Sequence, residues 1–148
     1  MSVLYLDTSA FLKLYVLESG SEAVQRIVEN QCDPLPVWEI QEMEFVNALK
    51  LKVFWNEIPI ADAKRLTDLF HDRKSRGLYY APEIRRSELM ADFRRLSDHT
   101  AEDGCRTMDI LHVACACQLK PGHFISFDAR QKKLAVHAGL QVTDLDAS

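Results

Sequence analysis

The chain has 148 residues, of which 47% are hydrophobic and 27% charged, and its formal net charge at pH 7 is −4. This size and mixture predict one soluble globular domain spanning residues 1–148 and argue against a disordered chain or a general nucleic-acid-coating protein. No apolar stretch is long enough to cross a bilayer, so we expect no membrane contact. The chain opens directly on a short apolar run without a secretion signal, which predicts a cytoplasmic protein.

The charges are distributed unevenly along the chain. Residues 50–106 hold 12 Lys and Arg against 10 Asp and Glu, whereas the remainder holds 6 against 12. One interpretation of this distribution is a basic surface beside an acidic hollow, which would guide a polyanion such as nucleic acid toward the hollow. The alternative interpretation is that these charges lie on solvated helix faces of mixed charge. The four cysteines, at positions 32, 105, 115 and 117, are interpreted as reduced thiols because their spacing matches no metal knuckle.

Apolar runs and helical periodicity alternate along the chain. Strands are predicted at residues 3–6, 35–37, 124–127 and 141–143, with a further strand or extended segment at 78–81. Helices are predicted at residues 10–16, 22–29, 39–55, 59–75, 84–99, 108–118 and 129–138. Strands that alternate with helices predict an α/β fold with a parallel sheet, right-handed crossovers and helices on both faces.

Three aspartates stand where a strand ends or a helix begins. Asp7 closes the first strand, Asp128 closes the strand at 124–127, and Asp109 follows a helix-capping Thr107. Open α/β sheets hold their ligands beyond the carboxyl ends of their strands, so these carboxylates are candidates for one site. Taken singly, each aspartate is equally well explained as a helix cap or as a partner of the helix dipole.

Glu44 is the fourth candidate, because of its place in the helix predicted at 39–55. It shares one helix face with four apolar residues, namely Ile40, Ala48, Leu51 and Trp55. A carboxylate inside an apolar stripe is costly to bury unless a metal or a charged partner meets it. The alternatives are a stripe edge that reaches water, or Glu42, which lies nearer the helix start where acidic residues suit the dipole.

Four neighbouring carboxylates raise one another's pKa unless cations compensate them. Ligand sets made of oxygen alone favour Mg²⁺ or Mn²⁺ over zinc, so we expect one of these ions as cofactor. His112 lies one helical turn beyond Asp109, and on an apolar helix we expect it to be packed and hydrogen-bonded rather than a metal ligand.

Four segments together resemble the PIN domain, specifically the small single-domain ribonucleases of the VapC toxin type. They are LDTSAFLKLY, EFVNALKLK, RTMDILHVACA and FISFDARQKKLAVHAGL, and the likeness that they carry runs in this order between residues 3 and 143. The resemblance implies a PIN-like three-layer α/β/α fold with a mainly parallel central sheet of four to five strands flanked by helices. It also supports Glu44 over Glu42. One departure is Val37-Trp38, where many relatives carry Ser or Thr before the glutamate helix.

The resemblance further implies a metal-dependent endoribonuclease that leaves 5′-phosphate and 3′-hydroxyl ends, in which Asp7, Glu44, Asp109 and Asp128 bind the metal. Thr8, Ser9, Asn47 and Ser126 are the supporting candidates. Such a protein is the toxin of a type II toxin–antitoxin system that inhibits translation, is bound by a cognate antitoxin and forms a homodimer. Candidate RNA contacts are Arg85, Arg86, Arg94, Arg95 and Arg106, together with Trp38, Tyr79 and Tyr80 as stacking surfaces unless they pack in the core.

Other functions fit the pattern less well. A phosphohydrolase of the haloacid-dehalogenase type expects a second aspartate where this chain has Ser9, and a receiver-like domain expects paired acids after the first strand. A PIN-fold nuclease of RNA processing and a non-catalytic RNA-binding or scaffolding PIN domain remain as alternatives.

Overall fold

A computed structural model describes residues 3–145 and confirms the α/β fold class. The strands are β1 (Leu4–Leu6), β2 (Leu35–Pro36), β3 (Tyr79–Tyr80) and β4 (His123–Ile125). The helices are α1 (Thr8–Leu12), α2 (Ser21–Glu29), α3 (Glu39–Phe54), α4 (Ile60–Ser75), α5 (Arg86–Ser97), α6 (Thr100–Asp103), α7 (Thr107–Leu119) and α8 (Ala129–His137). No helix within residues 3–145 combines the length and the apolar character that crossing a bilayer requires.

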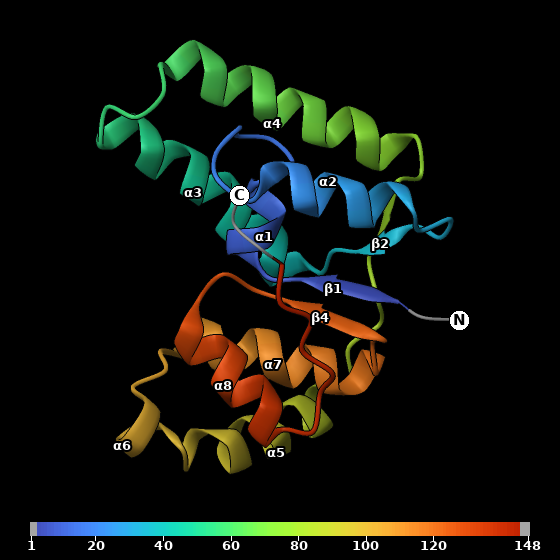
Figure 1. Cartoon of the computed structure of the whole chain (residues 1–148), viewed down its shortest axis with the longest axis vertical. Helices are drawn as coiled ribbons and strands as arrows, with labels where there is room; N and C mark the ends of the chain where they lie inside the picture. The colour runs from blue at the N-terminus through green and yellow to red at the C-terminus, as the bar shows by residue number, and fades with distance from the viewer. Residues whose placement is uncertain (1–2, 146–148) are drawn as a thin grey trace.

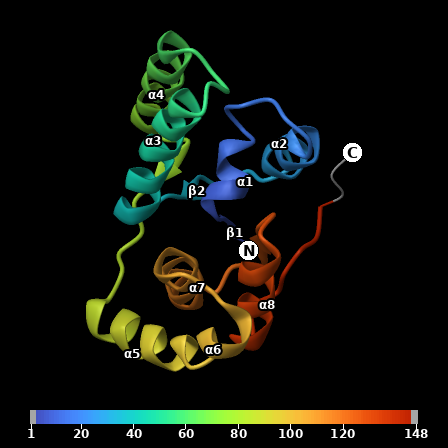
Figure 2. The same cartoon turned by 90° about the vertical axis from the view of Figure 1, so that its left-hand side faces the viewer.

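The helices cover both sides of the central strands, as Figures 1 and 2 show, with α1–α4 on one side of β1 and β4 and α5–α8 on the other. The alternating side chains of β1 explain the two layers. Leu4 and Leu6 belong to a core cluster with residues of α1, α3 and α4, among them Phe11 and Phe45. Tyr5 points the opposite way, into a second cluster with residues of α5, α7 and α8. The predicted three-layer arrangement is therefore confirmed.

The sheet is smaller than the predicted four to five strands. Within the described residues, β1 pairs in parallel with β4, and β2 pairs in parallel with β3, giving two sheets of two strands. The strand predicted at residues 141–143 is reduced to a single parallel bridge between Val142 and Phe124. The strand segments were therefore placed correctly, but they pair less extensively than predicted.

Glutamine side chains occupy the edge of β1 that β4 leaves free. The backbone N–H of Leu4 donates to Oε1 of Gln31 over 3.0 Å, and Nε2 of Gln41 donates to the carbonyl of Leu6. Both backbone groups are thus satisfied without a neighbouring strand, as buried peptide groups require. This replacement explains why the two strand pairs do not join into one ladder.

Several helix starts differ from the sequence prediction. The first helix begins at Thr8 and ends at Leu12, and its N-cap is Asp7 rather than Thr8 or Ser9. Helix α7 is capped by Arg106, so the prediction of Thr107 as the cap was wrong by one position. The short helix α6 was not predicted. The starts differ by one or two residues and the end of the first helix by four, and these shifts move no candidate carboxylate to another element.

Candidate functional site

A cavity of about 670 Å³ opens beside the carboxyl ends of β1 and β4, and all four predicted carboxylates line it. They come from four places in the fold: the β1–α1 junction, α3, the first turn of α7, and the N-cap of α8. The four are Asp7, Glu44, Asp109 and Asp128, and the predicted helpers Thr8, Ser9 and Asn47 line the same cavity. The fold therefore brings together residues that are up to 121 positions apart in the chain.

Asp7 is the most deeply buried of the four, with 3% of its surface exposed. Its Oδ1 accepts hydrogen bonds from the Ser9 hydroxyl at 2.7 Å and from the Ala10 backbone N–H at 2.9 Å, and its Oδ2 accepts one from the Ser126 hydroxyl. Burial raises the pKa of Asp7 above its usual value, although the charge of His112 and these hydrogen bonds oppose the rise. The carboxylate is fixed in place, yet its ionised form lacks a full compensating charge.

Gln131, on α8, connects Asp109 with Asp128. Its backbone N–H donates to Oδ1 of Asp128 over 3.2 Å, and its side-chain Nε2 lies 3.3 Å from Oδ1 of Asp109. The backbone N–H groups of Arg106 and Arg130 donate to Asp109 and Asp128, each over 2.9 Å. Within the described residues, Oε1 of the buried Gln131 has no hydrogen-bond partner, so a polar acceptor beside the carboxylates is left for a ligand or water.

Glu44 is held by a chain of buried polar groups. Its Oε1 accepts from the Thr8 hydroxyl and lies 2.7 Å from Nε2 of His112, whose Nδ1 is 2.9 Å from the Tyr5 hydroxyl. The indole N–H of Trp38 donates to the same hydroxyl over 3.2 Å. Although burial raises the pKa of Glu44, hydrogen bonding and charge from His112 outweigh it and leave that pKa below its usual value. Both contacts use Oε1, which leaves Oε2 for a ligand.

His112 is buried and hydrogen-bonded, as the sequence predicted, but its partners were not foreseen. When the ring is neutral, Nε2–H faces the carboxylate of Glu44 and Nδ1 accepts from Tyr5. The stripe on α3 that singled out Glu44 also needs correction. The buried face of α3 carries Gln41, Phe45 and Leu49, whereas Leu51 and Trp55 are exposed. Glu44 therefore faces the cavity rather than the core.

The candidate RNA contacts do not line this cavity, although the backbone N–H of Arg106 binds the cavity carboxylate Asp109. None of Arg85, Arg86, Arg94, Arg95 and Arg106 is among the side chains that line it. Arg85 pairs with Glu88 at 2.6 Å, and Arg95 pairs with Asp92 at 3.2 Å. Trp38 and Tyr79 are buried, so they are unsuited to stacking on bases, whereas Tyr80 is exposed.

The donor set suits a hydrated ion better than one held by protein alone. Within residues 3–145, only one group of three or more His, Cys, Asp and Glu side chains has its ligand atoms within 4.8 Å of one another, and that group lies outside this cavity. The cavity carboxylates are therefore spaced more widely than the ligands of a fully dehydrated ion. Mg²⁺ usually keeps several waters and needs only one or two carboxylates, so Asp7, Glu44, Asp109 and Asp128 fit Mg²⁺ or Mn²⁺ bound partly through water.

Comparison with solved structures identifies proteins of similar fold. The chain is similar to VapBC-1 from nontypeable Haemophilus influenzae, with a TM-score of 0.60 and 14% identity over 96% of this chain and 97% of that one. It is also similar to FitAcB from Neisseria gonorrhoeae, with a TM-score of 0.58 and 13% identity over the same shares. No protein-family model and no curated protein matches the chain. At these identities the likeness establishes a shared fold along nearly the whole chain.

Proposed function

We propose that this chain is a metal-dependent endoribonuclease that hydrolyses RNA phosphodiester bonds. The observation that carries the proposal is the meeting of four carboxylates, from four separate elements, at one cavity beside the carboxyl ends of parallel strands. Mg²⁺ or Mn²⁺ is the proposed cofactor. A bound divalent ion lowers the pKa of a coordinated water and offsets the charge that develops on the phosphate.

Different residues of the chain hold the separate carboxylates of this site in place. Asp7 is fixed by hydrogen bonds from Ser9 and Ser126, so its carboxylate enters the reaction already oriented. Asp128 is held by backbone N–H groups of α8, and Glu44 by His112. In this proposal, attack comes from water and not from the RNA 2′-hydroxyl, which gives products with 5′-phosphate and 3′-hydroxyl ends.

We further propose that the chain is the toxin of a type II toxin–antitoxin pair and acts as a single domain. Its sequence resembles VapC-type toxins, and one of the solved structures that share its fold is named VapBC-1. The cavity is an open hollow that a segment of a small antitoxin protein would cover. The partners in this proposal are an RNA substrate and a cognate antitoxin.

Apolar side chains on α3 and α4 support a further part of the proposal, a homodimer. Phe54 and Ile60 are 78% and 76% exposed, and Trp55, which follows α3, is also exposed. Figure 1 shows α3 and α4 side by side at one end of the molecule. Apolar groups gathered at one end of a fold are typical of a protein–protein contact. Light scattering coupled to size exclusion would report a mass twice that of the chain.

The direct test is cleavage of end-labelled RNA, both structured and single-stranded, by purified protein in Mg²⁺, Mn²⁺ or EDTA. The variant Asp7→Asn keeps the size of the side chain while it removes the charge, and Asp68→Asn changes an exposed aspartate of α4 as the matched control. We expect cleavage by the wild type and by Asp68→Asn that requires metal, and none by Asp7→Asn. Enzymatic probing of the new ends should find 5′-phosphate.

Equal behaviour of the wild type and Asp7→Asn would contradict the nuclease. RNA binding without cleavage would then favour a non-catalytic binding or scaffolding role. Cleavage without growth arrest on expression in a bacterial host would instead favour a nuclease of RNA processing over a toxin.

A further inference from the structure

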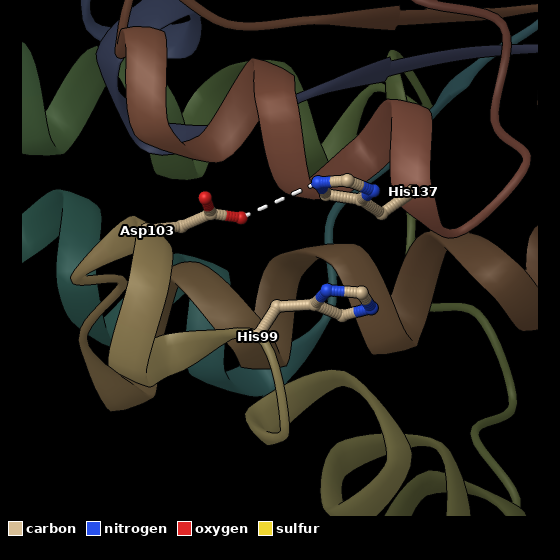
Figure 3. A group of neighbouring side chains, drawn as sticks. All are labelled: His99, Asp103 and His137. Atoms are coloured by element: carbon tan, nitrogen blue, oxygen red, sulfur yellow. Dashed lines mark ion pairs between the residues drawn. The ribbon is translucent and has the colours of Figure 1, made fainter.

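A second group of metal-ligating side chains lies at the end of α8 opposite to Asp128. His99, Asp103 and His137 place one potential ligand atom each within 4.8 Å of the others. Figure 3 shows the two imidazole rings face to face beside the carboxylate, and their centroids are 4.4 Å apart with planes inclined by 9°. His99 is the N-cap of α6, Asp103 ends α6, and His137 ends α8. The group therefore joins two elements that are separate in sequence.

Asp103 is the buried member of the group, with 1% of its side chain exposed. Within the described residues, neither carboxylate oxygen meets a partner in hydrogen-bond geometry. Two ion-pair contacts balance the charge, from Lys133 Nζ at 2.9 Å to Oδ1 and from His137 Nε2 at 3.5 Å to Oδ2. A buried carboxylate normally accepts several hydrogen bonds or binds a metal, so this one has unused coordinating capacity.

We propose that His99, Asp103 and His137 form a zinc site, with water in the remaining position. Two imidazoles and one carboxylate are a ligand set that Zn²⁺ takes in tetrahedral geometry. Nitrogen donors favour zinc, whereas the oxygen-only cavity favours Mg²⁺ or Mn²⁺, so the two sites would select different ions. Tetrahedral zinc ligands lie about 3.3 Å apart, given Zn–N bonds of about 2.0 Å. The three ligand atoms must therefore move closer, and because the two rings are stacked with planes only 9° apart, one ring must also rotate out of the stack before both nitrogens can face the same ion. The side chain of His137 is 38% exposed and has room to turn in this way.

Lys133 is the competitor for this site. Its ammonium occupies the neighbourhood of Asp103 Oδ1, but its side chain is 62% exposed and is free to swing into solvent. Binding of Zn²⁺ would replace one positive charge beside Asp103 with two. We therefore expect Lys133→Met to tighten zinc binding, since the competing charge is removed and no ligand is lost.

The place of the site in the fold indicates a structural role. α8 has nine residues and is about 13 Å long, so the zinc group lies roughly that far from Asp128 at the other end of the helix. α6 leads through Gly104 and Cys105 into the N-cap of α7, where Asp109 is held. A metal bound here would fasten the connection that carries Asp109 to the helix that carries Asp128.

The test is titration of the tag-free full chain with ZnCl₂ by calorimetry, together with its thermal unfolding. Cys32 is an exposed thiol, so all proteins would carry Cys32→Ser. We expect one zinc equivalent and a raised melting temperature, because a ligand that binds the folded state stabilises it. His99→Gln and His137→Gln should each weaken zinc binding by more than about 100-fold, which exceeds the loss usual when a residue that only hydrogen-bonds a metal ligand is changed. His71→Gln, an exposed histidine of α4, is the matched control and should bind as the parent does.

The proposal stands apart from the nuclease, since Asp7→Asn should leave this zinc equivalent intact. Unchanged affinity in both His99→Gln and His137→Gln would overturn it, as would loss of the zinc equivalent in Asp7→Asn. Nuclear magnetic resonance of the imidazole nitrogens gives a second readout. It uses the protein with all of its histidines in place, so it does not depend on whether a histidine variant folds. The signals of His99 and His137 should shift on zinc addition, and their constancy at saturating zinc would refute the site.

Discussion

The hydroxyl of Tyr5 connects the core to the candidate site, and its removal is the most informative single change. Tyr5 is fully buried on β1, and its hydroxyl contacts Nδ1 of His112 at 2.9 Å and the indole N–H of Trp38 at 3.2 Å. Both partners are themselves buried. Tyr5→Phe keeps the ring, which stacks on Phe124 with centroids 5.5 Å apart, and deletes only the polar atom.

The expected cost follows from the two partners that are left without a hydrogen bond. Each buried polar group that loses its partner costs about 1–3 kcal/mol, so with two such groups Tyr5→Phe should lower the free energy of unfolding by about 2–6 kcal/mol. For a chain of this size, 1 kcal/mol moves the melting temperature by about 2–4 °C. Urea denaturation followed by circular dichroism measures the change. The imidazole that holds Glu44 also loses its anchor, so metal-dependent cleavage should fall as well.

Tyr80→Phe is the matched control, because Tyr80 is 41% exposed whereas Tyr5 is fully buried. We expect the control to change the free energy of unfolding by less than about 0.5 kcal/mol. A cost below that value for Tyr5→Phe, or an equal cost for the two variants, would show that the buried hydrogen-bond chain does not form.

Three further predictions concern the carboxylates and the turn beside them. The pKa of Asp7 is raised on folding, so its contribution to the free energy of unfolding is favourable below the unfolded pKa of about 3.9 and is lost as pH rises through the folded pKa. Asp7→Asn should therefore stabilise the protein in EDTA at neutral pH. Urea denaturation at several pH values measures this difference. The pKa of Glu44 is lowered on folding, so the ionised side chain stabilises the folded protein above about pH 4.3, and this stabilisation is lost as pH falls. Glu44→Gln should therefore lower the free energy of unfolding at pH 7, and its difference from the wild type should shrink in acid. Gly20 has a φ of +92°, and an added Cβ would lie 2.9 Å from the ring of Phe127, whereas Gly77, with a φ of +83°, has open space around it. The contact is with the far edge of the Phe127 ring, which can shift, so Gly20→Ala should cost about 1 kcal/mol more than Gly77→Ala in the same denaturation assay, and equal costs would exclude the steric contact.

The sequence alone determined the order and nature of most elements, though not the short helix α6, and where the aspartates stand. Asp7 follows β1 directly and Asp128 lies in the short turn between β4 and α8, and both the strand and the turn after it are local properties of the chain. Asp109 likewise lies in the first turn of a helix that composition alone identifies. Parallel strands present their carboxyl ends at one edge, so the meeting of Asp7 and Asp128 followed from topology.

Only the tertiary structure decided which side chains support the carboxylates. The contact between His112 and Glu44 joins residues 68 positions apart, and Gln131 reaches Asp109 from another helix. No local pattern encodes such pairs, because they depend on how helices pack across the sheet. The same holds for the glutamines that replace a neighbouring strand along β1, and for His99, Asp103 and His137. Periodicity shows which face of an element is apolar, but the packing of its neighbours decides what that face meets.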